Sequence, residues 1–211
     1  MAHYITNDAR RWKKGILPIE VSKKVREMDQ DMAGNSVIGQ VIAEYKNKTN
    51  ILIVPRVASQ HSSYVKLTAS TYLRPGMCNS KVGRRGGRQL IQCSVANGRL
   101  NFGTLVHEFG HALGLKHEHQ RWDRDDNVIV NLILAKVNGR LGDYKKYSPV
   151  HYTMSGPYDV ASAMHYGANS GTQMMVRKDT RGTAGMGGGP GLSSGDVAAL
   201  NQLYPGRIKI R

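Results

Sequence analysis

The chain has 211 residues, of which 40% are hydrophobic and 21% are charged, and this balance is typical of a globular protein that can bury a sizeable core. No stretch approaches the roughly 20 apolar residues of a membrane span, and residues 1–25 lack the apolar segment of a secretory signal. Lys and Arg outnumber Asp and Glu by 30 to 15, which gives a formal net charge of +15. This charge favours acidic or anionic partners without specifying one.

The first half of the chain predicts strands and a helix. Short runs that are rich in β-branched residues and bounded by turn formers predict strands at 16–21, 50–57, 63–69 and 90–95. A helix is predicted between the first two strands because five apolar residues share one helical stripe: Val37, Ile38, Val41, Ile42 and Tyr45. The order of these elements indicates a β-α-β-rich first half.

Two more helices are predicted further along the chain. One runs from about Gly103 to Gly114, where apolar residues recur at helical spacing. Periodicity is weaker after it, and we interpret the glycine-rich tract at 181–191 as a loop. Ser193 and Asp196 then form a capping pattern before a last apolar stripe, which predicts a helix that closes the domain.

Three histidines within residues 107–117 follow the pattern H-E-x-x-H-x-x-G-x-x-H. His107 and His111 are four residues apart, so on a helix they point the same way and can share a metal ion. Gly114 can adopt the left-handed conformation that ends the helix and turns the chain back, so that His117 reaches the same ion. Three neutral imidazoles leave one position open, as in catalytic zinc sites. The shorter H-E-x-x-H pattern arises by chance on helices, but the eleven-residue form predicts one Zn²⁺ ion.

Two further residues of this segment do not fit the ligand set. Glu108 lies between the helical histidines but is displaced around the helix, so it can reach a water at the site without binding the metal. His119 follows His117 by two residues, and we interpret it as a neighbour of the site or a surface histidine.

This segment, followed by "EHQRWDRD", resembles the astacin family of zinc metalloendopeptidases within the metzincin clan. The family continues the third histidine with a glutamate, here Glu118, and with an R-x-D-R-D pattern that residues 121–125 match. Its second hallmark is a methionine turn of the form S-x-M-H-Y, which "SAMHYG" at 162–167 matches. Weaker similarities extend from about residue 11 to residue 204.

The resemblance implies an α+β, zincin-like catalytic domain of the metzincin type that covers residues 1–211. A mixed sheet and the zinc helix would form an N-terminal lobe of about residues 1–117. A C-terminal lobe of about residues 118–211 would lie on the other side of an active-site cleft. An extended substrate would pair with an exposed strand edge, for which "LIQCSV" (90–95) is the candidate.

The resemblance also assigns roles to single residues. His107, His111 and His117 would bind zinc, and Glu108 would be the general base that activates water. Tyr166 would touch the zinc in the resting enzyme and then hydrogen-bond the developing oxyanion. The apolar floor beneath the metal would be Met164.

In the family, the glutamate at the position of Glu118 accepts the buried α-amino group of the mature chain. A trimmed terminus near Ala2 or His3 would then pack towards this carboxylate. The rival arrangement is an exposed terminus, with Glu118 satisfied by Arg121, Arg124 or water.

The chain departs from the family at its cysteines. Many members have a second cysteine just after an "NG" before the zinc helix, where this chain has Arg99. Cys78 and Cys93 are the chain's two cysteines and allow at most one internal disulfide. A bridge between them is therefore not carried over from the family, and the sequence leaves it open.

The sequence thus predicts a secreted or exported, monomeric zinc endopeptidase that acts on proteins or peptides, acidic ones included. Arg177 and Arg181, downstream of the methionine turn, are candidate substrate-binding residues. The alternative is a basic protein that binds nucleic acid or another polyanion through "GRRGGR" (83–88) and holds a non-catalytic metal. An aromatic content of 7% and the lack of a recognised binding module disfavour that alternative. Glu108 and Tyr166 argue against an inactive metal-binding scaffold.

Overall fold

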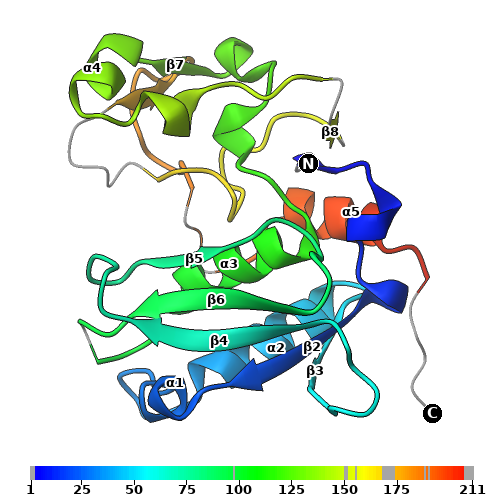
Figure 1. Cartoon of the computed structure of the whole chain (residues 1–211). Coiled ribbons are helices and arrows are strands. Elements are labelled where there is room, and N and C mark those ends of the chain that lie inside the picture. Colours follow the sequence, from blue (N-terminus) through cyan, green and yellow to red (C-terminus); the bar gives the residue numbers. More distant parts are fainter. Residues whose placement is uncertain are drawn as a thin grey trace.

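The structure is a computed structural model, and it describes residues 3–96, 98–149, 152–154, 156–167, 174–187, 189 and 191–206. Its larger part is a five-stranded mixed sheet with helices, and its smaller part holds short helices and a two-stranded sheet. Figure 1 shows α2 and α3 behind the large sheet and the smaller part next to β5 at its edge. The predicted α+β class is confirmed.

Strands and helices are longest in the first half of the chain. The strands are β1 (His3–Ile5), β2 (Ile16–Val21), β3 (Leu52–Pro55), β4 (Tyr64–Ser70), β5 (Cys78–Ser80), β6 (Arg88–Ser94), β7 (Val128–Val130), β8 (Tyr152–Met154) and β9 (Met175–Arg177). The α-helices are α1 (Lys23–Glu27), α2 (Val37–Lys48), α3 (Phe102–Leu113), α4 (Leu132–Val137) and α5 (Ser194–Leu203). Single 3₁₀ turns cover Asp8–Arg10, Lys13–Gly15, Glu118–Gln120, Arg124–Asp126 and Leu141–Tyr144.

The large sheet has the strand order β3-β2-β4-β6-β5. Its first four strands are parallel, and they are the four strands that the sequence predicted. β5 runs antiparallel to β6 and forms the outer edge. The prediction that "LIQCSV" offers the exposed edge is wrong, because β6 pairs on both sides, with β4 and with β5. The edge strand has only three residues inside a polar, glycine-rich segment, so hydrophobic periodicity could not indicate it.

The helix α2 shows how the apolar stripe positions an element. Ser36 caps it by accepting a hydrogen bond from the backbone N–H of Gly39. The predicted stripe is buried at Val37, Ile38, Val41 and Tyr45. The Tyr45 hydroxyl donates to the carbonyl of Val106 at 2.7 Å, and this bond ties α2 to the zinc-helix candidate α3.

The main hydrophobic core lies between the large sheet, α2, α3 and α5. The capping box that Ser193 and Asp196 predicted is present at the start of α5. This helix follows the smaller part in the chain, but its Leu200 and Leu203 are buried in the main core. A second, smaller core surrounds Tyr144. Among the described residues, no helix has the length and hydrophobicity to cross a membrane.

Candidate metal centre and active-site cleft

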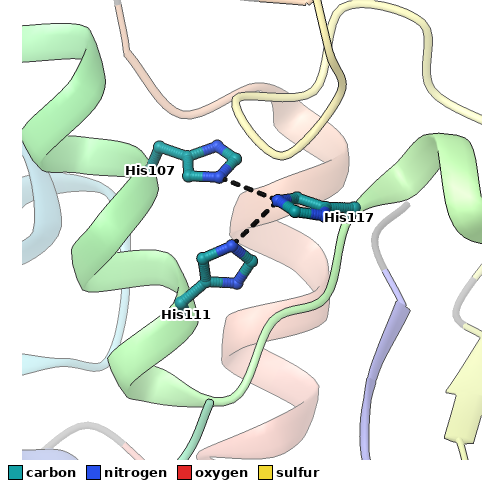
Figure 2. Close-up of side chains that lie close together, drawn as sticks. All are labelled: His107, His111 and His117. Atoms are coloured by element: carbon teal, nitrogen blue, oxygen red, sulfur yellow. Dashed lines mark hydrogen bonds between the residues drawn. The ribbon is translucent and has the colours of Figure 1, made fainter. Parts of the chain in front are cut away.

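Three histidine side chains converge where α3 ends. His107 and His111 lie on consecutive turns of α3, and Gly114 ends the helix with a left-handed φ of 109°. A Cβ at Gly114 would also lie 2.9 Å from a side-chain carbon of Ile5. Both the left-handed backbone conformation and the lack of space therefore require glycine at this turn. The chain turns back, and His117 Nε2 lies 3.2 Å from His107 Nε2 and 3.0 Å from His111 Nε2 (Figure 2).

Each of the three rings is oriented by an oxygen at its other nitrogen. Nδ1 lies 2.8–2.9 Å from the carbonyl of Ala163 for His107, the carbonyl of Leu115 for His111, and Oε1 of Gln120 for His117. Because these oxygens only accept hydrogen bonds, Nδ1 carries the proton and Nε2 keeps its lone pair. Burial also lowers the pKa of His107 and holds the pKa of His111 well below its usual value. The site therefore presents three imidazoles whose Nε2 atoms face one point, which fits a zinc ion.

The methionine turn packs directly beneath α3. Met164 is fully buried, and a Cβ at Gly110 would lie 2.6 Å from its Sδ, so a glycine is needed at this point of the helix. The carboxylate of Asp196 accepts hydrogen bonds from Ser162 Oγ at 2.6 Å and from the Ala163 N–H at 2.8 Å. Since the carbonyl of Ala163 holds His107, the start of α5 is linked to a histidine of the site.

Glu108 lies next to the histidines with one oxygen unpaired. Its Oε2 is buried and has no hydrogen-bond partner among the described residues. Burial raises the pKa of its carboxyl to about 7, because removal from water disfavours the charged form. The side chain lines the same cavity as the three histidines, and its role beside the metal stays a prediction.

Tyr166 also reaches this cavity. Its ring stacks on His119 with centroids 4.0 Å apart and lies 4.8 Å from the ring of His117. Burial raises the pKa of Tyr166 to about 12. His119 is fully buried rather than on the surface, and it lies 3.0 Å from the carbonyl of Asp143 through Nε2. It therefore packs behind the site, outside the cluster of three histidines that could hold a metal ion.

The Glu118 carboxylate is fully buried and pairs with Arg121. Its Oε1 accepts from Arg121 Nη1 and from the Asp159 N–H, each at 3.0 Å. Burial raises the pKa of this carboxyl, and the Arg121 guanidinium opposes the rise. Arg124 instead donates to the carbonyl of His119. Residues 1 and 2, on which the expected terminal amine would lie, are outside the described residues.

The cleft between the two parts holds a cavity of about 470 Å³. Its described lining residues come from β5, the start of α3, the three histidines and the methionine turn. The two candidate substrate-binding arginines are not among them: Arg177 pairs with Asp179 and lines a separate depression, and Arg181 lies exposed in the following turn. Their contact with substrate stays a prediction.

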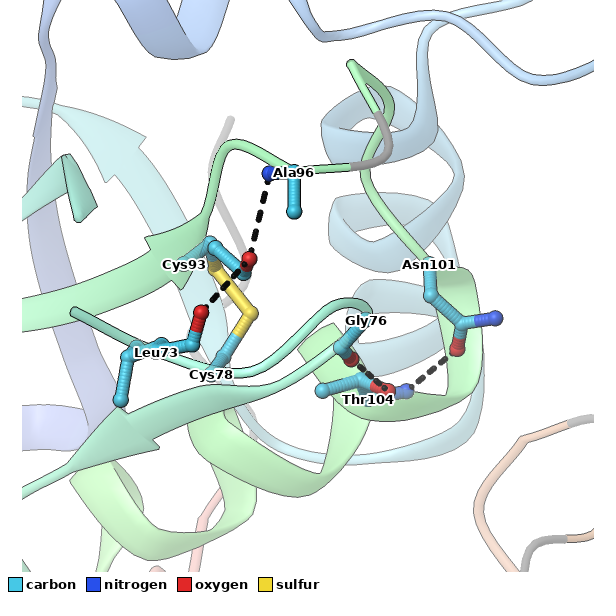
Figure 3. Close-up of a disulfide and its surroundings, with 8 residues drawn as sticks. Leu73, Gly76, Cys78, Cys93, Ala96, Asn101 and Thr104 are labelled. Carbon is cyan, nitrogen blue, oxygen red and sulfur yellow. Dashed lines mark hydrogen bonds between the residues drawn. A yellow bond between two sulfur atoms is a disulfide. The ribbon is translucent and has the colours of Figure 1, made fainter. Parts of the chain in front are cut away.

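A disulfide fixes the edge strand that borders the cavity. Cys78 and Cys93 are directly opposite each other on β5 and β6 and are bridged, as Figure 3 shows. At the neighbouring turn, Thr104 Oγ1 at the start of α3 donates to the carbonyl of Gly76 at 3.3 Å. The bridge that the sequence left open thus holds β5 beside the site.

Comparison with known proteins identifies the family. The family model for Astacin, a family of peptidases, matches residues 4–205. The chain belongs to the astacin family. The zinc metalloproteinase nas-4 of Caenorhabditis elegans is 34% identical over 201 residues, which are 92% of this chain and 59% of that protein. The zinc metalloproteinase nas-8 of Steinernema carpocapsae is 31% identical over 209 residues, 95% of this chain and 46% of that protein. The chain therefore spans less than two thirds of the length of these astacin-family relatives.

A solved astacin-like structure agrees with this assignment. High choriolytic enzyme 1, a hatching enzyme zinc-protease from Oryzias latipes, matches with a TM-score of 0.75 and 25% identity, over 97% of this chain and 98% of that chain. The histidine cluster of this chain fits the zinc site of an astacin-family metalloprotease.

Sequence reasoning missed the residues that orient the site. Gln120 was part of the astacin-like "EHQRWDRD" segment but carried no role, and Asp196 was interpreted as a helix cap alone. A spacing signal existed for Gln120, because a side chain three residues after His117 can fold back onto it. The contact between Asp196 and the methionine turn joins residues more than thirty positions apart, and the sequence gives no signal for it.

We expect Gln120→Leu to weaken zinc binding by about 10- to 100-fold, because His117 loses the oxygen that orients its ring. Competition with a chelating dye measures the zinc affinity. The matched variant Gln60→Leu changes an exposed glutamine outside the cavity lining and should keep the wild-type affinity. Unchanged affinity in Gln120→Leu would show that this oxygen does not control the ligand.

Replacement of both cysteines by alanine should lower the free energy of unfolding by about 3 kcal/mol. This is the value that loop entropy gives for a closed loop of about 15 residues, and the two cysteines are 15 residues apart in the sequence. Urea titration under non-reducing conditions measures the change. Reductant should destabilise the wild-type chain and leave the double variant unaffected. Equal stability of the two oxidised proteins would contradict the expectation.

Proposed function

We propose that this chain is a zinc-dependent endopeptidase that hydrolyses peptide bonds of proteins. One observation carries the proposal: the Nε2 atoms of three imidazoles converge at a cavity, and the Glu108 carboxylate beside them has a buried oxygen without a partner among the described residues. A ligand triad with an adjacent base is the donor set of a hydrolytic zinc site. The names of the astacin-family relatives support the same activity.

In this mechanism His107, His111 and His117 hold the metal. When bound, zinc acts as a Lewis acid on the scissile carbonyl and lowers the pKa of water. Glu108 removes a proton from the attacking water as its oxygen bonds to the carbonyl carbon. The carboxylic acid then gives this proton to the amide nitrogen as the carbon–nitrogen bond breaks. The products are a carboxylic acid and an amine, which at neutral pH exchange the second water proton to become a carboxylate and an ammonium group.

Tyr166 takes the role of donating a hydrogen bond to the oxyanion that forms on the carbonyl oxygen. Its ring lies beside His117 at the cavity wall. Because burial raises its pKa to about 12, the phenol keeps its proton at neutral pH and can donate. The stacked His119 ring supports the tyrosine from behind.

The remaining assignments are support roles. Met164 provides the apolar floor under the histidines, Gly114 provides the turn, and Glu118 fixes the segment after His117 through Arg121. We also propose that residues 1–211 act as one exported, monomeric catalytic domain with lobes of about 1–117 and 118–211. The polyanion-binding alternative explains the net charge but not the position of Glu108.

We expect Glu108→Gln to lower kcat by about 10²- to 10⁴-fold, since an amide cannot accept the water proton. Zinc content, measured by atomic absorption, should stay at one ion per chain because Glu108 is not a ligand. As a control, 1,10-phenanthroline should abolish wild-type cleavage of casein, and added zinc should restore it. Full proteolysis by a metal-free preparation would refute the zinc mechanism.

We expect Tyr166→Phe to lower kcat by about 10²- to 10³-fold, the usual loss when one oxyanion donor is removed, with a smaller change in KM. Steady-state kinetics on a single quenched peptide measures both constants. A tyrosine that only packs predicts a different result, namely a lower melting temperature with near-normal kcat. An unchanged kcat would remove Tyr166 from the mechanism.

A further inference from the structure

A recess of about 620 Å³ lies next to the active-site cleft, on the sheet face that points away from the helices. We call it the basic recess, and its charged lining residues are Lys81, Arg85 and Arg88. Three residues of β6 that line it, Arg88 among them, alternate along the strand with buried residues. The recess therefore opens on the outer face of the sheet.

The positive charge of the basic recess is not neutralised within the described residues. Lys81, Arg85 and Arg88 are exposed, and none of them takes part in an ion pair in the described part of the chain. No described residue of the lining is acidic. Glu20 is the one acidic residue in the five strands of the large sheet, and Arg56 and Lys66 already bind it. The recess is thus a local excess of three cations.

The basic recess continues the active-site cavity. Asn79 and Ser80 of β5 line both of them. In the described chain the outer edge of β5 pairs with no other strand, so an extended peptide can add to it through backbone hydrogen bonds. Such a peptide advances about 3.3 Å per residue and places alternate side chains on the outer face. One bound strand can therefore reach from the zinc ligands to the recess.

The direction of β5 decides which end of the peptide meets the cations. Before β5, Gly76 contacts the start of α3, and after it, Gly83 donates to the carbonyl of His111 at 2.8 Å. The recess lies towards Lys81, at the later end of this path. A peptide that pairs antiparallel, the more stable arrangement, brings the residues before the scissile bond to that end.

We propose that the basic recess binds an acidic side chain of the substrate on the amino-terminal side of the cleaved bond. Every second side chain of the added strand faces the recess, so the acidic residue stands either two or four residues before the scissile carbonyl, or one or three residues before it. The inference rests on the proposed endopeptidase function. A carboxylate on the outer face of the added strand lies beside Lys81 and within reach of the two guanidinium groups, which favour carboxylate oxygens. The shared lining with the cavity favours a peptide over a long polyanion.

Single-aspartate scanning of a quenched all-alanine peptide tests this inference. In the wild-type protein, aspartate at alternate positions before the cleaved bond should raise kcat/KM by about 3- to 10-fold, which is the range for exposed charge pairs with two or three cations. The gain should fall as salt is added. In the triple variant Lys81→Gln/Arg85→Gln/Arg88→Gln, the ratio of aspartate to alanine rates should fall to about one.

The matched control is Lys23→Gln/Lys46→Gln/Lys136→Gln, which removes the same charge from three exposed lysines outside the recess. It should keep the wild-type ratio, and all three proteins should cleave the alanine peptide equally. An unchanged ratio in the recess variant would overturn the inference, as would a gain confined to positions after the cleaved bond. Loss of heparin binding with an unchanged ratio would assign the recess to a polyanion instead.

This design separates the inference from the function on which it rests. A wild-type protein that cleaves no peptide of the set and no casein would overturn the proposed function, and the inference with it. An active enzyme whose rates ignore the aspartate position would overturn the inference alone. Equal losses on the aspartate and alanine peptides in the recess variant would mean that the three residues support the fold, which also contradicts a role in specificity.

Discussion

The active site depends on three hydrogen bonds that fix the imidazole rings through Nδ1. A histidine side chain can turn about two bonds, so helical spacing alone does not aim its Nε2 at a common point. Here each ring meets an oxygen from a different part of the chain: the methionine turn, the turn after α3, and the 3₁₀ turn after His117. The site therefore exists only when all three segments are packed, which links metal binding to folding.

The segment that holds His107 is itself held by a buried carboxylate. Asp196 caps α5, and the same carboxylate accepts from Ser162 and from the Ala163 N–H. A buried acceptor that loses its donors is costly, so α5 and the methionine turn constrain each other. The last helix accordingly packs in the main core, although it follows the smaller part of the chain. The start of α5 thus lies beside the methionine turn and helps to hold the site.

Local patterns predicted the parts of this structure that local physics determines. The strand at Ile16–Val21, the stripe of α2 and the turn at Gly114 all follow from neighbouring residues. The cluster of three histidines was predictable because their spacing encodes one helix turn and one reversal. The edge position of β5 was not predictable, because a strand of three residues carries no periodic signal and strand order is a long-range property. Asp196 was missed as a site residue because its partners in the methionine turn come from tertiary packing, whereas Gln120 was missed although its partner His117 is only three residues away.

The edge strand sets how rigidly a substrate can be held. β5 is bridged to β6 through Cys78, and the carbonyl of Gly76 before it accepts from Thr104 on α3. Gly83, after it, bonds to the carbonyl of His111. Both ends of the strand are therefore anchored to α3. This helix also carries two of the histidines. A peptide paired with this edge is positioned relative to the metal by covalent and hydrogen-bonded links, and such fixed geometry lowers the entropic cost of reaching the reactive arrangement.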